Sequence, residues 1–247
     1  MDNPRTEALI GRENAQKLKD ATVAVIGVGG VGGFAVEALA RSGVGRLILV
    51  DKDTVEPSNR NRQLCALQST VGQSKTQIFR ERIADINPET EVIAIDGFYD
   101  KEMNDKLANL KPDFVIDCID SLGSKMDLIR FCLDEDIPFL VSCGMARKTD
   151  PSKIEITELE KTSYDPIAKK LRVWKRKNRI RDKIWVCSST EKPVELGDGP
   201  LPSMIFVPGS AGLLLASTAV QKLLEKPLRK AESLKAAPEN PEPQPQN

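Results

Sequence analysis

Short apolar segments alternate with longer segments of helical periodicity through the first 150 residues. The apolar segments are rich in β-branched residues and span 22–26, 46–50, 91–95, 113–118 and 138–143. Between them, residues 32–41, 72–85 and 124–134 repeat apolar positions at helical spacing. This alternation predicts parallel strands joined by crossover helices that cover both faces of one sheet.

The pattern changes after residue 150. Residues 153–158 alternate polar and apolar positions, as a half-exposed strand does, so we expect the sheet to continue there as a mixed sheet. Asp165 and Pro166 are typical of a helix N-cap and first turn. In the helix that follows, Trp174 would lie on an apolar face and most other positions are basic.

We expect an α/β fold with a Rossmann-like, three-layer arrangement, a mixed but mostly parallel sheet, and an added basic helix with a crossover loop. One domain would span residues 1–231, with halves 1–150 and 151–231, and the basic helix and loop would occupy 165–208. Within this insertion, the loop would span 178–208. An apolar helix over 210–224 is too short for a membrane span and is expected in the core. The tail 232–247 is rich in proline and polar residues and is predicted to be disordered.

The composition excludes several classes of protein. Histidine is absent, which excludes mechanisms that need an imidazole as base, metal ligand or pH switch. The five cysteines include no CxxC pair, which argues against a disulfide framework and a structural zinc site. The chain has neither a long apolar run nor a signal-like start, so we expect a cytoplasmic protein that does not contact membranes.

The formal net charge is zero, but one segment is strongly basic. Between residues 169 and 183 there are nine cations and one carboxylate. Such a segment indicates either a polyanionic partner or a solvated face. The cations are Lys169, Lys170, Arg172, Lys175, Arg176, Lys177, Arg179, Arg181 and Lys183.

A glycine-rich turn follows the first predicted strand. Its glycines are Gly27, Gly29, Gly30 and Gly32, and a predicted helix begins there. Glycines allow a tight turn and a close approach of phosphates, and the helix N-terminus offers free N–H groups. Asp51 ends the next predicted strand and can accept hydrogen bonds from ribose hydroxyls. The turn alone would favour NAD or FAD over ATP.

Polar residues after Asp51 shift this preference toward ATP. Asp53, Asn59, Arg62 and Lys75 follow within the expected ligand-binding edge of the sheet. A triphosphate carries about four negative charges and needs additional cations, which Arg62 and Lys75 can supply. Asp120 comes two residues after a predicted strand and can hold Mg²⁺ through its oxygens.

Four motifs occur in a characteristic order: GVGGVG, LVDKDTVEPSNRNRQ, VGQSK and CIDS. In this order they resemble the ubiquitin-activating-type adenylating superfamily, which converts a carboxylate into an acyl-adenylate. The resemblance implies that Asp51 binds ribose, that Asn59, Arg62 and Lys75 bind phosphates, and that Asp120 binds Mg²⁺. It further implies a homodimer in which an arginine crosses the interface, with Arg5 and Arg12 as the candidates.

The second half is similar to the tRNA threonylcarbamoyladenosine dehydratases. The similarity lies in four segments: KTDP at 148–151, KTSYDPIAK at 161–169, CSSTEKP at 187–193 and VPGSAG at 207–212. The paired CxxC motifs of sulfur-carrier activators are missing. The resemblance implies ATP-dependent cyclisation of a modified adenosine beside the tRNA anticodon, with the basic segment binding RNA phosphates. A sulfur-relay protein and a monovalent cation, Na⁺ or K⁺, are further expected partners.

Alternatives remain open at this point. Cys187 lies in the predicted crossing loop, where ubiquitin-activating-type enzymes carry a thioester cysteine, and Lys183 and Lys192 could lower its pKa. Intramolecular cyclisation needs no such nucleophile. Cys118 and Cys143 are expected in the core. The rival functions are activation of a ubiquitin-like or sulfur-carrier protein, and a non-catalytic RNA-binding or NAD-binding role. Trp174 is expected to pack its helix, and Trp185 is a weak candidate for base stacking.

Overall fold

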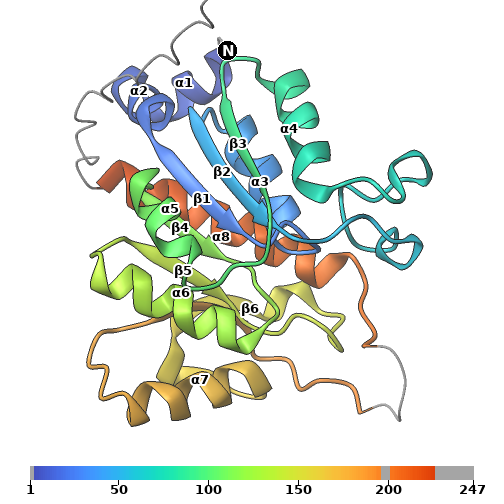
Figure 1. Ribbon diagram of the computed structural model, residues 1–247, viewed down its shortest axis with the longest axis vertical. Helices are drawn as coiled ribbons and strands as arrows, with labels where there is room; N and C mark the ends of the chain where they lie inside the picture. The colour runs from blue at the N-terminus through green and yellow to red at the C-terminus, as the bar shows by residue number, and fades with distance from the viewer. Residues whose placement is uncertain (1–2, 196–200, 226–247) are drawn as a thin grey trace, which may run out of the picture.

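The computed structural model describes residues 3–195 and 201–225, which form an α/β fold around one sheet (Figure 1). The seven strands lie in the order β3-β2-β1-β4-β5-β7-β6, and all are parallel except β6, which runs antiparallel to β7. The strands are β1 (Thr22–Ile26), β2 (Arg46–Asp51), β3 (Glu91–Asp96), β4 (Phe114–Asp117), β5 (Phe139–Ser142), β6 (Ile154–Glu158) and β7 (Trp185–Ser189). The predicted fold class, with its mixed and mostly parallel sheet, is confirmed.

Helices cover both faces of the sheet. They are α1 (Pro4–Ile10), α2 (Arg12–Asp20), α3 (Gly32–Arg41), α4 (Lys75–Ile86), α5 (Met103–Asn109), α6 (Leu122–Asp134), α7 (Pro166–Lys177) and α8 (Phe206–Glu225). Helices α3, α4 and α8 share a core cluster on one face, whereas α5, α6 and α7 pack on the other. The result is the three-layer arrangement predicted from the sequence.

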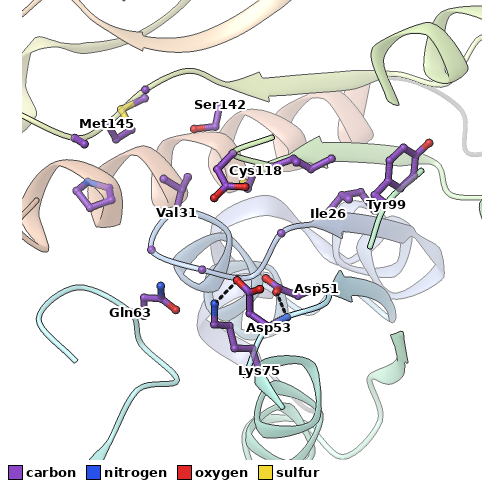
Figure 2. Close-up of a pocket in the computed structure, with 18 of the residues that line it drawn as sticks. Ile26, Val31, Asp51, Asp53, Gln63, Lys75, Tyr99, Cys118, Ser142 and Met145 are labelled. Atoms are coloured by element: carbon purple, nitrogen blue, oxygen red, sulfur yellow. Dashed lines mark hydrogen bonds and ion pairs between the residues drawn. The ribbon is translucent and has the colours of Figure 1, made fainter. Parts of the chain in front are cut away.

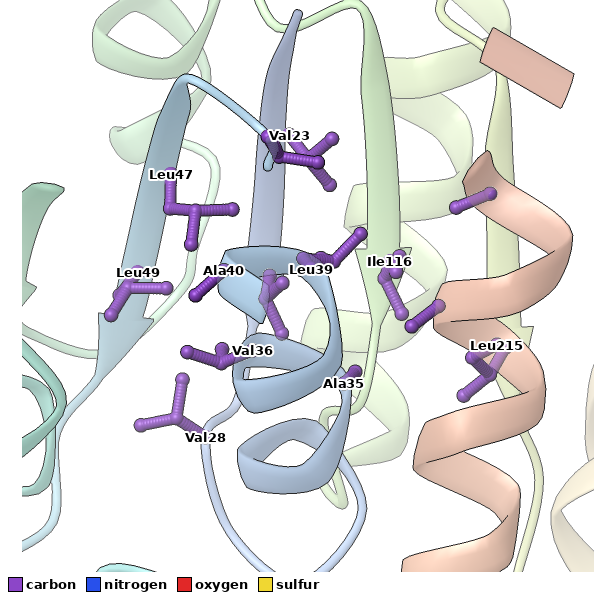
Figure 3. Packing of buried hydrophobic residues seen from close by; sticks show 14 of the residues in the cluster. Val23, Val28, Ala35, Val36, Leu39, Ala40, Leu47, Leu49, Ile116 and Leu215 are labelled. Carbon is purple, nitrogen blue, oxygen red and sulfur yellow. The ribbon is translucent and has the colours of Figure 1, made fainter. Parts of the chain in front are cut away.

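The apolar strand sequences follow from this double coverage. All five residues of β1 are buried. Val23 and Val25 contribute to the cluster beneath α3 and α8, and Ala24 and Ile26 contribute to the opposite cluster. Figure 3 shows the first of these clusters, in which Leu39 of α3 and Leu215 of α8 lie in one layer beside the strands. A strand buried on both faces loses the alternation of polar and apolar positions.

The prediction of a crossing loop over residues 178–208 is wrong over 206–208, which belong to α8, and over 185–189, which form β7. This strand pairs with β5 on one side and with β6 on the other, with Val141 opposite Val186. Its short apolar run is surrounded by charge, so the sequence pattern alone did not reveal it. Helices α1, α2 and α5 were also not predicted. The tail at 232–247 and residues 196–200 of the predicted loop lie outside the described residues.

The carboxyl ends of the parallel strands meet at one edge of the sheet. Strand order reverses between β1 and β4, because the chain runs outward to β2 and β3 before it returns to the other side of β1. In α/β sheets, ligands bind in the crevice at such a switch point. Over residues 3–195 and 201–225, no helix is long and apolar enough to cross a membrane.

Candidate functional site

A cleft of about 330 Å³ opens at this edge of the sheet. The segments that follow β1, β2, β3, β4 and β5 all contribute to its walls (Figure 2). Among the candidates from the sequence, the residues that line it are Gly27, Gly29, Gly30, Asp51, Asp53, Arg62, Lys75 and Asp120. Residues as distant in the chain as Gly27 and Asp120 therefore face one cavity.

The glycine turn brings the backbone of β1 close to that of β4. Gly27 has φ = 88°, and a Cβ atom there would lie 2.7 Å from the carbonyl oxygen of Cys118. Gly32 does not line the cleft, and a Cβ at this position would lie 1.8 Å from the carbonyl oxygen of Gly27. The turn therefore requires glycine at both positions, and α3 begins directly at the cleft with its free N–H groups.

Asp51 joins the end of β2 to the glycine turn. Its Oδ2 accepts a hydrogen bond from the Val28 N–H at 2.7 Å, and its Oδ1 accepts one from the Asp53 N–H at 2.9 Å. Burial raises the pKa of this carboxyl above its ordinary value. A carboxylate has about four acceptor positions, so Asp51 can still receive hydroxyl donors from the cleft.

Lys75 places a nearly buried ammonium group beside the cleft. Its Nζ lies 3.0 Å from Asp53 Oδ2, and its side chain is 5% exposed whereas that of Asp53 is 52% exposed. Lys75 is the first residue of α4, and the preceding Ser74 caps the helix. A cation at a helix N-terminus is disfavoured by the helix dipole, so an anionic ligand in the cleft would stabilise it.

Arg62 and Gln63 form the wall next to the glycine turn. Arg62 Nη1 donates to the Ser58 carbonyl oxygen at 3.1 Å and to Asn61 Oδ1 at 2.8 Å. Gln63 Oε1 is buried and has no hydrogen-bond partner within the described part of the chain. Its amide faces Gly29 at the cleft. A ligand with a donor group would satisfy this oxygen.

Asn59 is separate from the cleft. Its side chain is buried, and its Oδ1 accepts a hydrogen bond from the Glu56 N–H at 3.1 Å. Asn59 thus closes a short 3₁₀ turn at Pro57–Asn59. In this structure it supports the segment that carries Arg62 and does not face the cavity.

Asp120 presents an exposed carboxylate at the cleft, after β4. Below it, Lys125 Nζ donates to Asp117 Oδ1 at 2.8 Å, and both side chains are at most 1% exposed. Asp117 Oδ1 also accepts the Ile119 N–H, which fixes the start of the segment that carries Asp120. Burial raises the pKa of Asp117.

The described residues contain no cluster of three or more metal-ligating side chains. Mg²⁺ usually takes one or two protein carboxylates together with substrate phosphates and water. A single exposed carboxylate such as that of Asp120 fits this mode of binding.

The expectation that Cys187 lies in a loop is wrong. It lies within β7, fully buried, with its Sγ 3.9 Å from the carbonyl oxygen of Ala211. Burial raises its pKa, which is the opposite of activation. Lys183 and Lys192 form ion pairs with Glu158 and Glu195 instead of lying beside the thiol.

Two other thiols belong to the cleft wall. Cys143 is buried and Cys118 is half-buried, and both line the cavity. Burial raises the pKa of both thiols, so they form an uncharged surface there. The expected core position is thus observed for Cys143, with the added role of facing the cleft.

The basic segment divides into bound and free cations. Arg172 donates to Thr162, Lys175 is buried against Glu160, and Lys183 pairs with Glu158. The other six cations are exposed and have no side-chain partner in the described part of the chain. These six are Lys169, Lys170, Arg176, Lys177, Arg179 and Arg181. The free charge is therefore smaller than the sequence suggests, but it is gathered on α7 and the turn after it.

The tryptophans and the N-terminal arginines lie away from the cleft. Trp174 packs in the cluster under α7, as expected, and Trp185 is 44% exposed. Arg12 forms an ion pair with Glu7 near the amino ends of β2 and β3, at the opposite edge of the sheet. Arg5 is exposed on α1. Neither arginine lines the cleft of its own chain.

Several lining residues were not found from the sequence. They include Lys52, Phe98, Tyr99, Ser142, Met145 and Ser203. Tyr99 donates through its hydroxyl to Asn104 Oδ1 at 2.6 Å, and the Lys52 Nζ lies 5.3 Å from the Phe98 ring centroid. Most of them lie at the carboxyl end of a strand or within three residues after it, so the rule that ligands bind beyond the carboxyl ends of strands could have identified them.

Comparisons with known proteins agree with this geometry. The model of the ThiF family matches residues 4–241. A tRNA threonylcarbamoyladenosine dehydratase from Bacillus subtilis is 47% identical over 238 residues, which cover 90% of this chain and 94% of the relative. Crystal structures of the tRNA N6-threonylcarbamoyladenosine dehydratase of Escherichia coli are also similar. Its complex with AMP has a TM-score of 0.85 at 34% identity, and its complex with ATP has 0.84 at 35% identity. Each alignment covers 90% of this chain and 93% of the other.

Proposed function

The chain belongs to the ThiF family, and we propose that it is a tRNA threonylcarbamoyladenosine dehydratase that uses ATP to cyclise its substrate. One observation carries the proposal. The glycine turn, Asp51 and Lys75 line a single cleft, in a chain that matches a dehydratase over nearly the full length of both proteins. The expectation from the sequence motifs and this comparison therefore agree.

ATP binds in the cleft. The glycine turn and the N-terminus of α3 offer backbone N–H groups to the phosphates. Arg62 and Lys75 add positive charge to the cleft, and Asp51 accepts hydrogen bonds from the ribose. The unpartnered Oε1 of Gln63 supplies one further acceptor for a donor group of the ligand.

Mg²⁺ would be held by Asp120 together with the phosphates. When bound, it would neutralise negative charge on the phosphates during the reaction. The buried pair of Asp117 and Lys125 would keep the segment of Asp120 in place. The monovalent cation expected from the resemblance stays a prediction.

The proposed chemistry has two steps. An oxygen of the threonyl carboxylate attacks the α-phosphorus of ATP, and the bond to the β-phosphate breaks, which yields an acyl-adenylate and pyrophosphate. The neighbouring carbamoyl nitrogen or oxygen then attacks the acyl carbon, loses a proton, and releases AMP. The product is one water lighter than the substrate, and the lost oxygen leaves with AMP. Positioning within one molecule accounts for much of the rate, and no protein nucleophile is needed.

The RNA would lie on the six free cations of α7 and the following turn. Phosphate contacts by exposed Lys and Arg supply most of the affinity for nucleic acids and depend on salt. A homodimer with an arginine supplied across the interface, and a sulfur-relay partner, stay predictions, as does the cytoplasmic location. Because Arg5 and Arg12 are remote from the cleft in their own chain, a partner subunit would have to bring either of them to ATP.

The proposal is tested with tRNA that carries threonylcarbamoyladenosine, incubated with the protein, ATP and Mg²⁺. Cyclisation removes one water, so mass spectrometry of the nucleosides should show a loss of about 18 Da. This loss should require ATP. With ¹⁸O in the threonyl carboxylate, one labelled oxygen should appear in AMP. Label in inorganic phosphate would contradict adenylation. Unchanged tRNA, together with pyrophosphate exchange stimulated by a small carrier protein, would favour the rival function.

A further inference from the structure

A buried contact joins the first turn of α7 to one wall of the cleft. Asp165 is the N-cap of α7, and its Oδ1 accepts a hydrogen bond from the Ala168 N–H at 2.8 Å. Its Oδ2 accepts a second one from the Gly144 N–H, also at 2.8 Å. Gly144 follows β5 and lines the cleft. One carboxylate therefore holds both a helix end and a wall of the nucleotide cavity.

Lys148 completes this contact from the other side of Gly144. Its Nζ donates to the Gly144 carbonyl oxygen at 2.8 Å and lies 3.7 Å from Asp165 Oδ2. The side chains of Lys148 and Asp165 are 1% and 0% exposed. A Cβ atom on Gly144 would lie 3.1 Å from Asp165 Oδ2, so a larger residue would press against the carboxylate. Both polar backbone groups of Gly144 are thus held by buried, charged side chains.

The same wall is also fixed at its far end. The Arg147 N–H donates to the Pro202 carbonyl oxygen at 2.9 Å, and the Val194 N–H donates to the Arg147 carbonyl oxygen at 2.8 Å. Arg147 has φ = 62°, in the left-handed region that non-glycine residues keep only where their surroundings enforce it. Met145 and Ala146, which lie between the two fixed points, line the cleft.

Helix α7 runs from the cleft to the basic surface. Ile167, its second residue, lines the cleft itself. The exposed Lys169 and Lys170 follow within one turn, and Lys177 lies about 15 Å further along the helix than Ile167, at about 1.5 Å per residue. Arg172 and Lys175 hold the middle of this helix to the segment at 159–162, and Asp165 holds its first turn to the cleft wall.

An ordinary helix cap does not explain this arrangement. An N-cap needs one side-chain oxygen and no burial. Burial of a carboxylate and an ammonium group costs desolvation that their attraction repays only in part. The second oxygen of Asp165 and the ammonium group of Lys148 both form hydrogen bonds with the backbone of Gly144, which lines the cleft. The contact is therefore better explained by the position it gives the wall than by helix stability alone.

We infer that Asp165 and Lys148 are positioning residues for the dehydration, because they attach the cleft wall at 144–146 to the RNA-binding helix α7. RNA held on α7 would then present its modified nucleoside at a defined place beside the bound ATP. This inference rests on the proposed function. It predicts that ATP and tRNA can each still bind when the attachment is broken, but that they no longer meet in a reactive geometry.

The test compares Asp165→Asn and Lys148→Met with the wild-type protein. The Asp165→Asn variant keeps one oxygen that can accept the hydrogen bond of the helix cap. Its amide nitrogen replaces the second oxygen and cannot accept a hydrogen bond from the Gly144 N–H. The measurements are the Kd of ATP, the Kd of the modified tRNA, kcat at saturation with both, and the melting temperature. Asp150→Asn is the matched control, since Asp150 caps the short helix at Pro151–Lys153 through the Ser152 N–H and does not line the cleft.

We expect kcat to fall about 10- to 100-fold in both variants, the size of effect that a displacement of about 1 Å produces. Both Kd values should stay within about threefold of wild type, a change of less than 1 kcal/mol. Any effect of saturating tRNA on ATP affinity should disappear in the variants. The control should match the wild type in all four measurements.

The other outcomes overturn the inference. Unchanged kcat in both variants would show that the attachment is not used in the reaction. If Asp165→Asn does not fold, Lys148→Met tests the inference alone, because this variant keeps the helix cap. If its tRNA affinity and melting temperature decrease together with kcat, the contact has a structural role only. A wild-type protein that leaves the tRNA unchanged would overturn the proposed function itself, whereas an active wild type with equally active variants overturns this inference alone.

Discussion

Lys75 Nζ lies 3.0 Å from Asp53 Oδ2, and the nearly buried ammonium group sits at the N-terminus of α4. Both residues line the cleft, and the Asp53 carboxylate is the more exposed member of the pair. In ligand-free protein, Asp53 therefore balances a positive charge that the helix dipole disfavours. A polyphosphate in the cleft would share or replace this partner.

We expect Lys75→Ala and Asp120→Ala each to reduce ATP-dependent dehydration by 100-fold or more, roughly the effect of removing one charge-stabilising group from an active site. The fold should persist, because neither substitution opens a large cavity in the main core clusters. Turnover is measured by nucleoside mass spectrometry and the fold by circular dichroism. Lys222→Ala, which removes an exposed lysine paired with Glu225, is the control. Activity retained in both cleft variants would refute the assigned site.

The buried pair of Asp117 and Lys125 makes a prediction about stability. Lys125→Met leaves the Asp117 carboxylate buried without its counter-charge, which should lower the free energy of unfolding by about 3–5 kcal/mol. The double variant Asp117→Asn with Lys125→Met should recover part of this loss, since no uncompensated charge remains. Urea unfolding of the four proteins of this cycle measures the coupling. The prediction is contradicted if the double variant loses more free energy of unfolding than the two single variants lose together.

The same pair predicts a dependence on pH. Burial raises the pKa of Asp117 above that of an unfolded aspartate, and removal of Lys125 raises it further. A carboxyl group with a raised pKa favours the folded state when it is protonated, and this stability is lost as the pH rises through the raised pKa. The deficit of Lys125→Met relative to wild type should therefore be smallest in acid and grow toward neutral pH. A deficit that is constant with pH would indicate impaired packing only.

Cys187 should be dispensable for catalysis. Its thiol is buried in β7 with a raised pKa, so it is neither accessible nor ionised at neutral pH. We expect Cys187→Ala to keep kcat within about twofold of wild type and to cost about 1 kcal/mol of stability. Cys132→Ala, which removes another buried thiol from a separate cluster, is the matched control. Loss of turnover in folded Cys187→Ala alone would support a thioester mechanism and the rival function.

The free cations should determine RNA affinity. Replacement of Arg176, Lys177 and Arg179 by Gln should weaken tRNA binding and reduce the slope of log K against log salt by about 0.7–0.9 for each RNA phosphate that is no longer neutralised. Titrations at several salt concentrations measure both effects. In the control, Lys17, Lys101 and Lys222 are replaced, since these lysines lie outside the basic segment and pair with carboxylates there. An equal effect of both triple variants would mean that the basic segment is only a solvated face.

Short-range patterns in the sequence determined the strands β1 to β6, the helices α3, α4, α6, α7 and α8, and the glycine turn with Asp51. Each of these depends on residues within about 20 positions of one another, where hydrophobic periodicity and caps are informative. Asp165, for example, was correctly expected as an N-cap because its partner, the Ala168 N–H, is three residues away.

The tertiary structure decided the features that depend on distant parts of the chain. Cys187 became a buried strand residue because β5 and β6 pair on either side of it. Lys175 and Lys183 form ion pairs with glutamates of the segment at 158–160, so they do not belong to the free cations. The second oxygen of Asp165 reaches Gly144, 21 positions earlier. No local pattern encodes such contacts, because they form only when folding brings separate segments of the chain together.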